Sequence, residues 1–234
     1  MRPELAVPNG IGTLNEKPLH AALKRWCAGP GDTMEVPVDG FTVDLVRGDL
    51  LIEVQTRNLS GIRRKLSRLL EGHPVRLVYP VARERWIVRQ TRDGTRVLGR
   101  RKSPRRGTAY SLFEELVGVA GLLAHPGFSF QLVLIREEEI RRPAPGRAWR
   151  RKGWTTCERR LLDVVEQRLF EQPRDMLAFV PDSLSGPFTT GDLARATGRP
   201  VWLAQKMAYC LRTMGAIEAV GKRGRSNLYT RPAD

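Results

Sequence analysis

The hydrophobic positions in the first part of the chain alternate between helical spacing and short strand-like runs. Apolar residues recur at helical spacing over Asn15–Trp26 and Ser60–Glu71, and Ser111–Ala124 is predicted as a further helix. Between these segments lie runs that suit β-strands: Thr33–Val38, Phe41–Arg47, Leu50–Thr56, Val75–Tyr79, Trp86–Arg89 and Phe128–Ile135. This order of elements predicts an α/β domain.

A basic segment rich in proline and glycine, residues 141–153, interrupts this pattern. Such residues break regular structure, so we expect a basic linker there between one domain at 1–140 and another at 154–234. A second basic loop is expected at Gly99–Gly107, which holds Arg100, Arg101, Lys102, Arg105 and Arg106. Charged loops are often only solvated, but two in one chain favour contacts with phosphate groups.

The last part of the chain, residues 154–234, has the pattern of three helices and a hairpin. We expect a helix at Glu158–Glu171, a short helix capped by Thr189 or Thr190, and a third helix from Pro200 to Gly215. Two strands then flank a basic turn: Ala216–Val220 and Asn227–Arg231. This order of elements resembles the winged helix-turn-helix domains of transcription regulators.

By that resemblance, the third helix faces the major groove of DNA and the hairpin touches the backbone or minor groove. The residues expected to contact DNA lie on the outer face of the helix and at the basic turn: Trp202, Gln205, Lys206, Tyr209, Lys222, Arg223 and Arg225. Gln205 is suited to read a base, and the turn to hold phosphates. The alternative is a module for protein contacts, with Trp202 and Tyr209 in the interface.

Charge and composition favour a nucleic-acid partner. Lys and Arg number 40 against 25 Asp and Glu, a formal net charge of +15, so we expect DNA, with RNA as the alternative polyanion. The three cysteines lack metal-ligand spacing and indicate a reducing compartment. With no apolar run of ~18–20 residues and no signal-peptide pattern at Met1–Gly10, we expect a cytoplasmic protein without a membrane partner. A homodimer stays open.

Two turns in the segment Thr33–Thr56 fix a predicted strand register. If Gly48-Asp49 is a two-residue turn, Asp44 lies opposite Glu53 and Thr42 opposite Gln55 on one polar face. The other face is apolar and pairs Val43 with Val54 and Leu45 with Ile52. By the same logic, a turn at Asp39-Gly40 places Glu35 opposite Asp44, and Pro37 puts its strand at the sheet edge.

Two opposed carboxylates favour a cation between them, because their Cβ atoms lie ~4.5–5.5 Å apart and like charges repel. Such an oxygen-rich pair suits Mg²⁺ or Mn²⁺, which would be completed by water and substrate phosphate. The segment Leu50–Val54 is apolar around Glu53, which indicates a buried acid that needs a partner. The alternative is a solvated hairpin face with ordinary surface charges.

The pattern of Glu16 on a first helix, Asp44 on a second strand and Glu53-Val54-Gln55 on a third resembles the PD-(D/E)xK nuclease superfamily. The order helix, three strands, helix, strand over Leu14–Arg89 also resembles its restriction-endonuclease-like mixed-sheet core. The resemblance implies that Asp44 and Glu53 hold a metal and that Glu16 positions the metal or a water. The metal-bound water would attack a phosphodiester phosphorus.

Gln55 stands where that superfamily usually has lysine. Glutamine orients water or phosphate by hydrogen bonds but carries no charge. Lys65 on the following helix is the candidate to supply the missing positive charge. These residues support two hypotheses. The first is a metal-dependent DNA nuclease targeted by the winged helix. The second is a non-catalytic DNA-binding protein, regulatory or architectural, with a degenerate nuclease fold.

Overall fold

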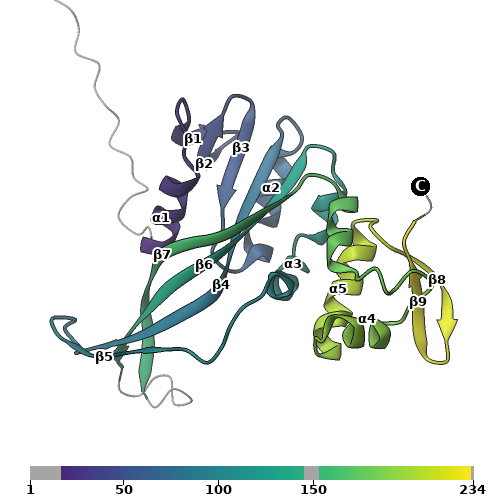
Figure 1. The fold of residues 1–234 in the computed structure, drawn as a ribbon. Helices are drawn as coiled ribbons and strands as arrows, with labels where there is room; N and C mark the ends of the chain where they lie inside the picture. Colours follow the sequence, from purple (N-terminus) through teal and green to yellow (C-terminus); the bar gives the residue numbers. More distant parts are fainter. Residues whose placement is uncertain (1–16, 145–152, 233–234) are drawn as a thin grey trace, which may run out of the picture.

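A computed structural model describes residues 17–144 and 153–232. They form a mixed α/β protein with a large twisted sheet beside a smaller helical unit (Figure 1). The strands run in the order β1-β2-β3-β4-β6-β7, with β5 paired to β4. Their bounds are β1 Thr33–Val38, β2 Phe41–Arg47, β3 Leu50–Val54, β4 Val75–Gln90, β5 Val97–Lys102, β6 Phe128–Pro143 and β7 Trp154–Phe170.

The sheet is mixed because its two halves are connected differently. Strands β1, β2 and β3 are antiparallel hairpin neighbours. Strands β3 and β6 both run parallel to β4, which requires crossover connections that carry helices. The helical segments are α1 Pro18–Cys27, η2 Leu59–Ile62, α2 Arg63–Leu69, η3 Ala109–Leu112, α3 Phe113–Leu116 and η4 Ala120–Ala124.

Helices cover both faces of the first strands and so create two cores. Leu19 and Leu23 of α1 pack against Ile52 and Val78 on one face. The larger core contains α2, α3 and the residues of the sheet that point the other way, such as Leu51. Because β3 is buried on both faces, it reads as an almost continuous apolar run.

The predicted register of the hairpins is confirmed near the two turns, but the predicted pairs of Asp44 with Glu53 and with Glu35 are not formed. Arg47 pairs with Leu50 and Leu45 with Ile52, and Val38 pairs with Phe41 across the Asp39-Gly40 turn. Strand β1 lies at the sheet edge as expected.

Four other predictions are wrong. The helix expected at Ser111–Ala124 is instead broken into the short segments η3, α3 and η4. The two strands expected at Val75–Tyr79 and Trp86–Arg89 are one strand, β4. Part of the loop expected at Gly99–Gly107 is strand β5, which pairs along β4. The helix expected at Glu158–Glu171 is instead part of β7.

Strand β7 forms because β6 offers it a partner along its whole length. The two strands pair from Pro143 and Trp154 to Phe130 and Phe170, and this long ladder overrides the helical spacing of the leucines. One of those leucines, Leu162, is 45% exposed to solvent, so it does not contribute to a buried helix face. The predicted boundary at 141–153 therefore does not mark the end of the sheet, because β7 lies beyond it; residues 145–152 lie outside the described ranges.

The C-terminal unit contains η6 Pro173–Phe179, α4 Thr190–Thr197, α5 Val201–Thr213 and the hairpin β8 Glu218–Arg223 with β9 Ser226–Thr230. Thr189 caps α4 by accepting a hydrogen bond from the backbone of Asp192, as predicted. The unit shares the larger core with the sheet: the ring of Phe179 lies 5.5 Å from that of Phe170 at the end of β7. Within the described ranges, no helix is long and apolar enough to cross a bilayer.

Candidate active site

Asp44 lies on β2, where its carboxyl group is held between α1 and β3. Its Oδ2 accepts a hydrogen bond from the backbone N–H of Val54 at 2.8 Å and lies 3.2 Å from His20 Nε2. Burial raises the pKa of Asp44, but the hydrogen bonds from His20 and Val54, together with the charges of His20 and Lys65, hold the pKa below its ordinary value. Asp44 is therefore held as a carboxylate.

Glu53 lies on β3 and is only 4% exposed. Lys65 Nζ lies 2.5 Å from Glu53 Oε1 and also donates to the carbonyl oxygen of Thr42 at 2.6 Å. Burial and the charge of Asp44 raise the pKa of Glu53 to about 7, although Lys65 lowers it. Glu53 is thus a buried acid for which one ammonium group is not full compensation.

The two acids meet where the ladder between β2 and β3 ends. Regular pairing reaches Leu45 and Ile52. Beyond that pair, the Asp44 carboxylate accepts a hydrogen bond from the backbone N–H of Val54. The Glu53 carboxyl group accepts a hydrogen bond from the backbone of Asp44. Each acid therefore occupies a hydrogen-bonding position of the neighbouring strand.

The structure does not form the single polar face that the register predicted for Thr42, Asp44, Glu53 and Gln55. Val43 packs into the core on the α2 side, whereas Leu45 packs on the α1 side, so the alternation of β2 is broken at Asp44. Asp44 turns toward His20 of α1 and Glu53 toward Lys65 of α2. The two carboxyl groups are therefore engaged by helices that cover opposite faces of the sheet.

Three other residues of the predicted site do not join this pair. Glu35 has a φ of 55°, a conformation rare outside glycine; it is not paired with Asp44, and its carboxylate accepts a hydrogen bond from Lys24 at 2.6 Å. Gln55 is half-buried, and its backbone N–H donates to Val78. Glu16 lies outside the described residues.

In chemical kind, the two carboxylates are the donors that a hard divalent cation prefers. Among residues 17–144 and 153–232, no three His, Cys, Asp or Glu side chains lie close enough together to form a metal cluster. Mg²⁺ typically takes only one or two carboxylates and completes its shell with water and substrate phosphate. The pKa of the buried Glu53 is raised by burial and by the charge of Asp44, even with the Lys65 ammonium beside it. A metal cation bound there would favour the ionised form of Glu53. Asp44 and Glu53 are the residues that would hold it.

The raised pKa of Glu53 predicts that Glu53→Gln changes the pH dependence of stability. The carboxyl group of Glu53 binds a proton more tightly in the folded state than in the unfolded chain, where its pKa is near 4.5. The stabilisation is therefore complete below about pH 4.5 and is lost as pH rises through about 7. Across this pH range the stability of Glu53→Gln relative to wild type is therefore expected to rise by about 1–3 kcal/mol.

Urea unfolding in EDTA at a series of pH values measures this difference. The matched control is Glu71→Gln, the same change at an exposed position of the chain. A difference between wild type and Glu53→Gln that stays constant with pH would show that Glu53 is not held in the way described.

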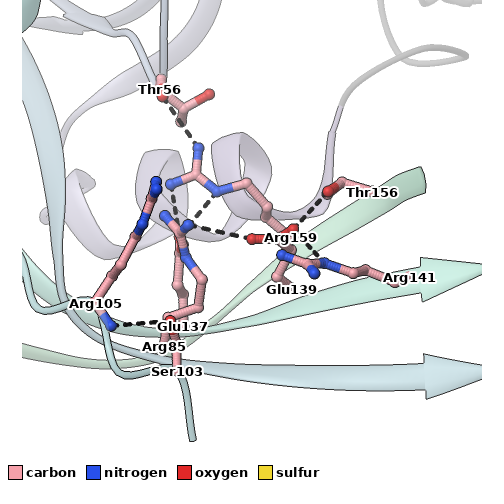
Figure 2. Close-up of polar contacts among 9 residues, drawn as sticks. All are labelled: Thr56, Arg85, Ser103, Arg105, Glu137, Glu139, Arg141, Thr156 and Arg159. Carbon is pink, nitrogen blue, oxygen red and sulfur yellow. Dashed lines mark hydrogen bonds and ion pairs between the residues drawn. The ribbon is translucent and has the colours of Figure 1, made fainter. Parts of the chain in front are cut away.

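A second cluster of charged residues was not predicted from the sequence. Glu137 of β6 is fully buried, and one carboxylate oxygen accepts from Arg85 at 2.5 Å. The other accepts from Nε and Nη2 of Arg159 at 2.9 and 2.6 Å (Figure 2). Arg159 Nη1 also donates to the carbonyl oxygen of Thr56, just beyond β3, at 3.2 Å. The cluster therefore links β4, β6 and β7 to the end of β3.

Glu139 extends this cluster along β6. It accepts from Thr156 at 2.5 Å and from Arg141 at 2.8 Å, and Arg85 Nη1 lies 3.2 Å from its second oxygen. Burial raises the pKa of Glu139, but these donors hold it below its ordinary value. Glu137 and Glu139 are two positions apart, which places them on one face of a strand, but the strand was expected to end at Ile135, before both residues.

The residues predicted to contact DNA differ in how far they contact the rest of the protein. Lys206 Nζ lies 5.9 Å from the centre of the Trp202 ring. Lys206 donates to the carbonyl oxygen of Glu114 at 3.0 Å, and Arg223 lies 3.3 Å from Asp192. The others are exposed: Trp202, Gln205, Tyr209, Lys222 and Arg225. The outer face of α5 thus keeps its aromatic residues accessible, while its lysine contacts α3.

Comparison with known proteins identifies a family without giving an activity. Residues 17–171 match the family described as Domain of unknown function (DUF8091), and this match ends next to the last residue of β7, Phe170. An uncharacterized protein of Treponema pallidum (strain Nichols) is 33% identical over 220 residues, which cover 94% of this chain and 86% of that protein. No solved structure matches the chain. Since the match spans more than half of the chain, the protein belongs to the family described as Domain of unknown function (DUF8091).

Proposed function

We propose that the protein is a metal-dependent DNA nuclease of the PD-(D/E)xK type. The observation that carries this proposal is the meeting of Asp44 and Glu53 at the end of the β2–β3 ladder, with Lys65 against Glu53. The element order from α1 to β4, with β3 parallel to β4, supports the same proposal.

In this proposal Asp44 and Glu53 would hold one Mg²⁺ or Mn²⁺ ion, which supplies an activated water and stabilises charge on the phosphate. His20 and the backbone of Val54 orient Asp44 and keep it ionised. Lys65 would supply the positive charge that Gln55 lacks, since its ammonium group lies beside Glu53. Gln55 is left to orient water or phosphate by hydrogen bonds.

We further propose that α4, α5 and the β8–β9 hairpin act as a winged helix that brings the protein to DNA. The order of these elements supports this, with η6 in the place of a first helix. Trp202, Gln205 and Tyr209 would face the groove, while Lys222 and Arg225 would contact phosphates. Lys206 and Arg223 would have to leave Glu114 and Asp192 before binding.

Replacing Lys222 and Arg225 together with alanine is expected to weaken DNA binding and reduce its salt dependence. Each lost phosphate contact lowers the log–log salt slope by ~0.9 on duplex DNA. Binding is measured by fluorescence anisotropy over a range of KCl concentrations. Lys17→Ala with Arg25→Ala, two exposed cations at α1, is the charge-matched control. If both double variants give the wild-type slope, the hairpin does not face DNA.

A second candidate function is DNA binding without cleavage, by a degenerate nuclease scaffold. The observation that favours it is that both acids already have partners in the protein: Lys65 lies beside Glu53, and Asp44 Oδ2 has two partners. The replacement of the usual lysine by Gln55 points the same way.

Cleavage assays separate the two functions. The full chain is incubated with single-stranded, duplex and branched DNA in Mg²⁺ or Mn²⁺, with EDTA as the blank. The nuclease proposal expects cleavage that needs the metal and is lost in Asp44→Asn and in Glu53→Gln. Binding without metal-dependent cleavage of any of these substrates would favour the second candidate.

A further inference from the structure

A cavity of about 460 Å³ opens just beyond the end of β3 and is lined by five arginines. They are Arg57, Arg85, Arg105, Arg106 and Arg159. Two acids, Glu114 and Glu115, also line the cavity, so cations outnumber anions on its walls. A larger cavity of about 590 Å³ holds Arg47 and Arg76, but these contact Asp32 and Glu171. The arginine-lined cavity is therefore the stronger candidate for an anionic ligand.

Two of these arginines are fixed by the buried acids of β6. Arg85 and Arg159 share Glu137, and Arg159 also donates to the carbonyl oxygen of Thr56 (Figure 2). A guanidinium has five donors in a rigid fork. An arginine whose fork is oriented by a buried carboxylate needs little reorganisation to meet a phosphate with its remaining donors.

The loop that carries Arg105 and Arg106 is anchored to β4 at both ends. The backbone N–H of Ser103 donates to the carbonyl oxygen of Arg85 at 2.7 Å, and that of Gly107 to Ala82 at 2.9 Å. A Cβ on Gly107 would lie 2.6 Å from the Ala82 carbonyl oxygen, so only glycine permits this close approach. The loop therefore holds a fixed position beside the cavity.

The side chains of Arg57, Arg105 and Arg106 have no ion pair or side-chain hydrogen bond within residues 17–144 and 153–232. All three are exposed. Two of these guanidinium groups are oriented by buried acids and three are open to solvent, an arrangement suited to the anionic oxygens of a phosphate group.

We infer that this cavity binds a backbone phosphate of the DNA strand that enters the Asp44–Glu53 site. Its position supports this, because Thr56 and Arg57 follow β3 directly, two and three residues beyond Val54. The inference rests on the proposed function for the identity of the strand. It adds a site that places the strand beside the acids, separate from the C-terminal unit.

The test measures DNA binding in EDTA, where no cleavage occurs, with the full chain and a fluorescein-labelled duplex. Arg105→Ala with Arg106→Ala removes two open cations without breaking an ion pair among the described residues. Binding is expected to weaken, and the salt slope to fall by up to ~0.9 for each lost phosphate contact. Lys17→Ala with Arg25→Ala removes the same charge away from the cavity and is expected to bind more tightly than the cavity variant.

Thermal unfolding of each variant identifies any loss of fold, and Arg57→Ala tests the cavity from a different segment of chain. The inference is overturned if both cavity variants, still folded, bind DNA as the control does, or if wild type does not bind DNA in EDTA. It stands, while the catalytic proposal falls, if the cavity variants lose binding but wild type never cleaves.

Discussion

Replacing Asp44 with asparagine is expected to reduce the rate of metal-dependent DNA cleavage by more than about 100-fold. This figure is a lower bound, because loss of an outer partner of a metal ligand alone costs about 10–100-fold. Asparagine keeps the shape of the side chain and a carbonyl oxygen for the N–H of Val54, but it removes the negative charge that a cation needs. The fold should therefore persist while the chemistry is lost.

The matched control is Asp49→Asn, the same chemical change in the exposed turn of the β2–β3 hairpin. It is expected to cleave at the wild-type rate. Initial rates at saturating Mg²⁺ on whichever DNA wild type cleaves give the comparison. Equal losses in the two variants would indicate damage to the hairpin, and no loss in Asp44→Asn would remove Asp44 from the catalytic site.

Replacing Glu137 with alanine is expected to destabilise the fold by about 3–5 kcal/mol, the usual cost of leaving the partners of a buried ion pair uncompensated. Glu137 is fully buried and holds both Arg85 and Arg159. These arginines keep some contact with solvent, which places the expected loss at the lower end of that range.

The neighbouring Glu138 provides the control, since it contacts Arg100 at the surface of the same strand. Glu138→Ala is expected to cost less than about 1 kcal/mol. Urea unfolding midpoints with a common m-value measure both losses. If the two variants are equally stable, the cluster of Figure 2 does not hold the strands together.

The hairpin region could be predicted from sequence because its signals are local. The turns at Asp39-Gly40 and Gly48-Asp49 are short and their residues specify the turn type, so the register of β1, β2 and β3 follows. The cap at Thr189 is equally local. In each case the residues that decide the structure lie within a few positions of one another.

Strand β7 could not be predicted in this way because its partner is distant in the sequence. Its leucines fit a helix, and only pairing with β6 makes a strand the better solution. The cavity arginines share this difficulty: Arg57, Arg105 and Arg159 come from three separate segments that the sheet brings together. The break in β2 at Asp44 depends on contacts from both α1 and β3.

Isothermal titration calorimetry of the metal-free full chain with Mn²⁺ measures binding to the shared cation site in the absence of substrate. Wild type is expected to bind one Mn²⁺ ion tightly. Asp44→Asn alone and Glu53→Gln alone are each expected to abolish this binding. Equal uptake by wild type and by the variant carrying both amides, or no uptake by wild type, would contradict a cation held between the second and third strands.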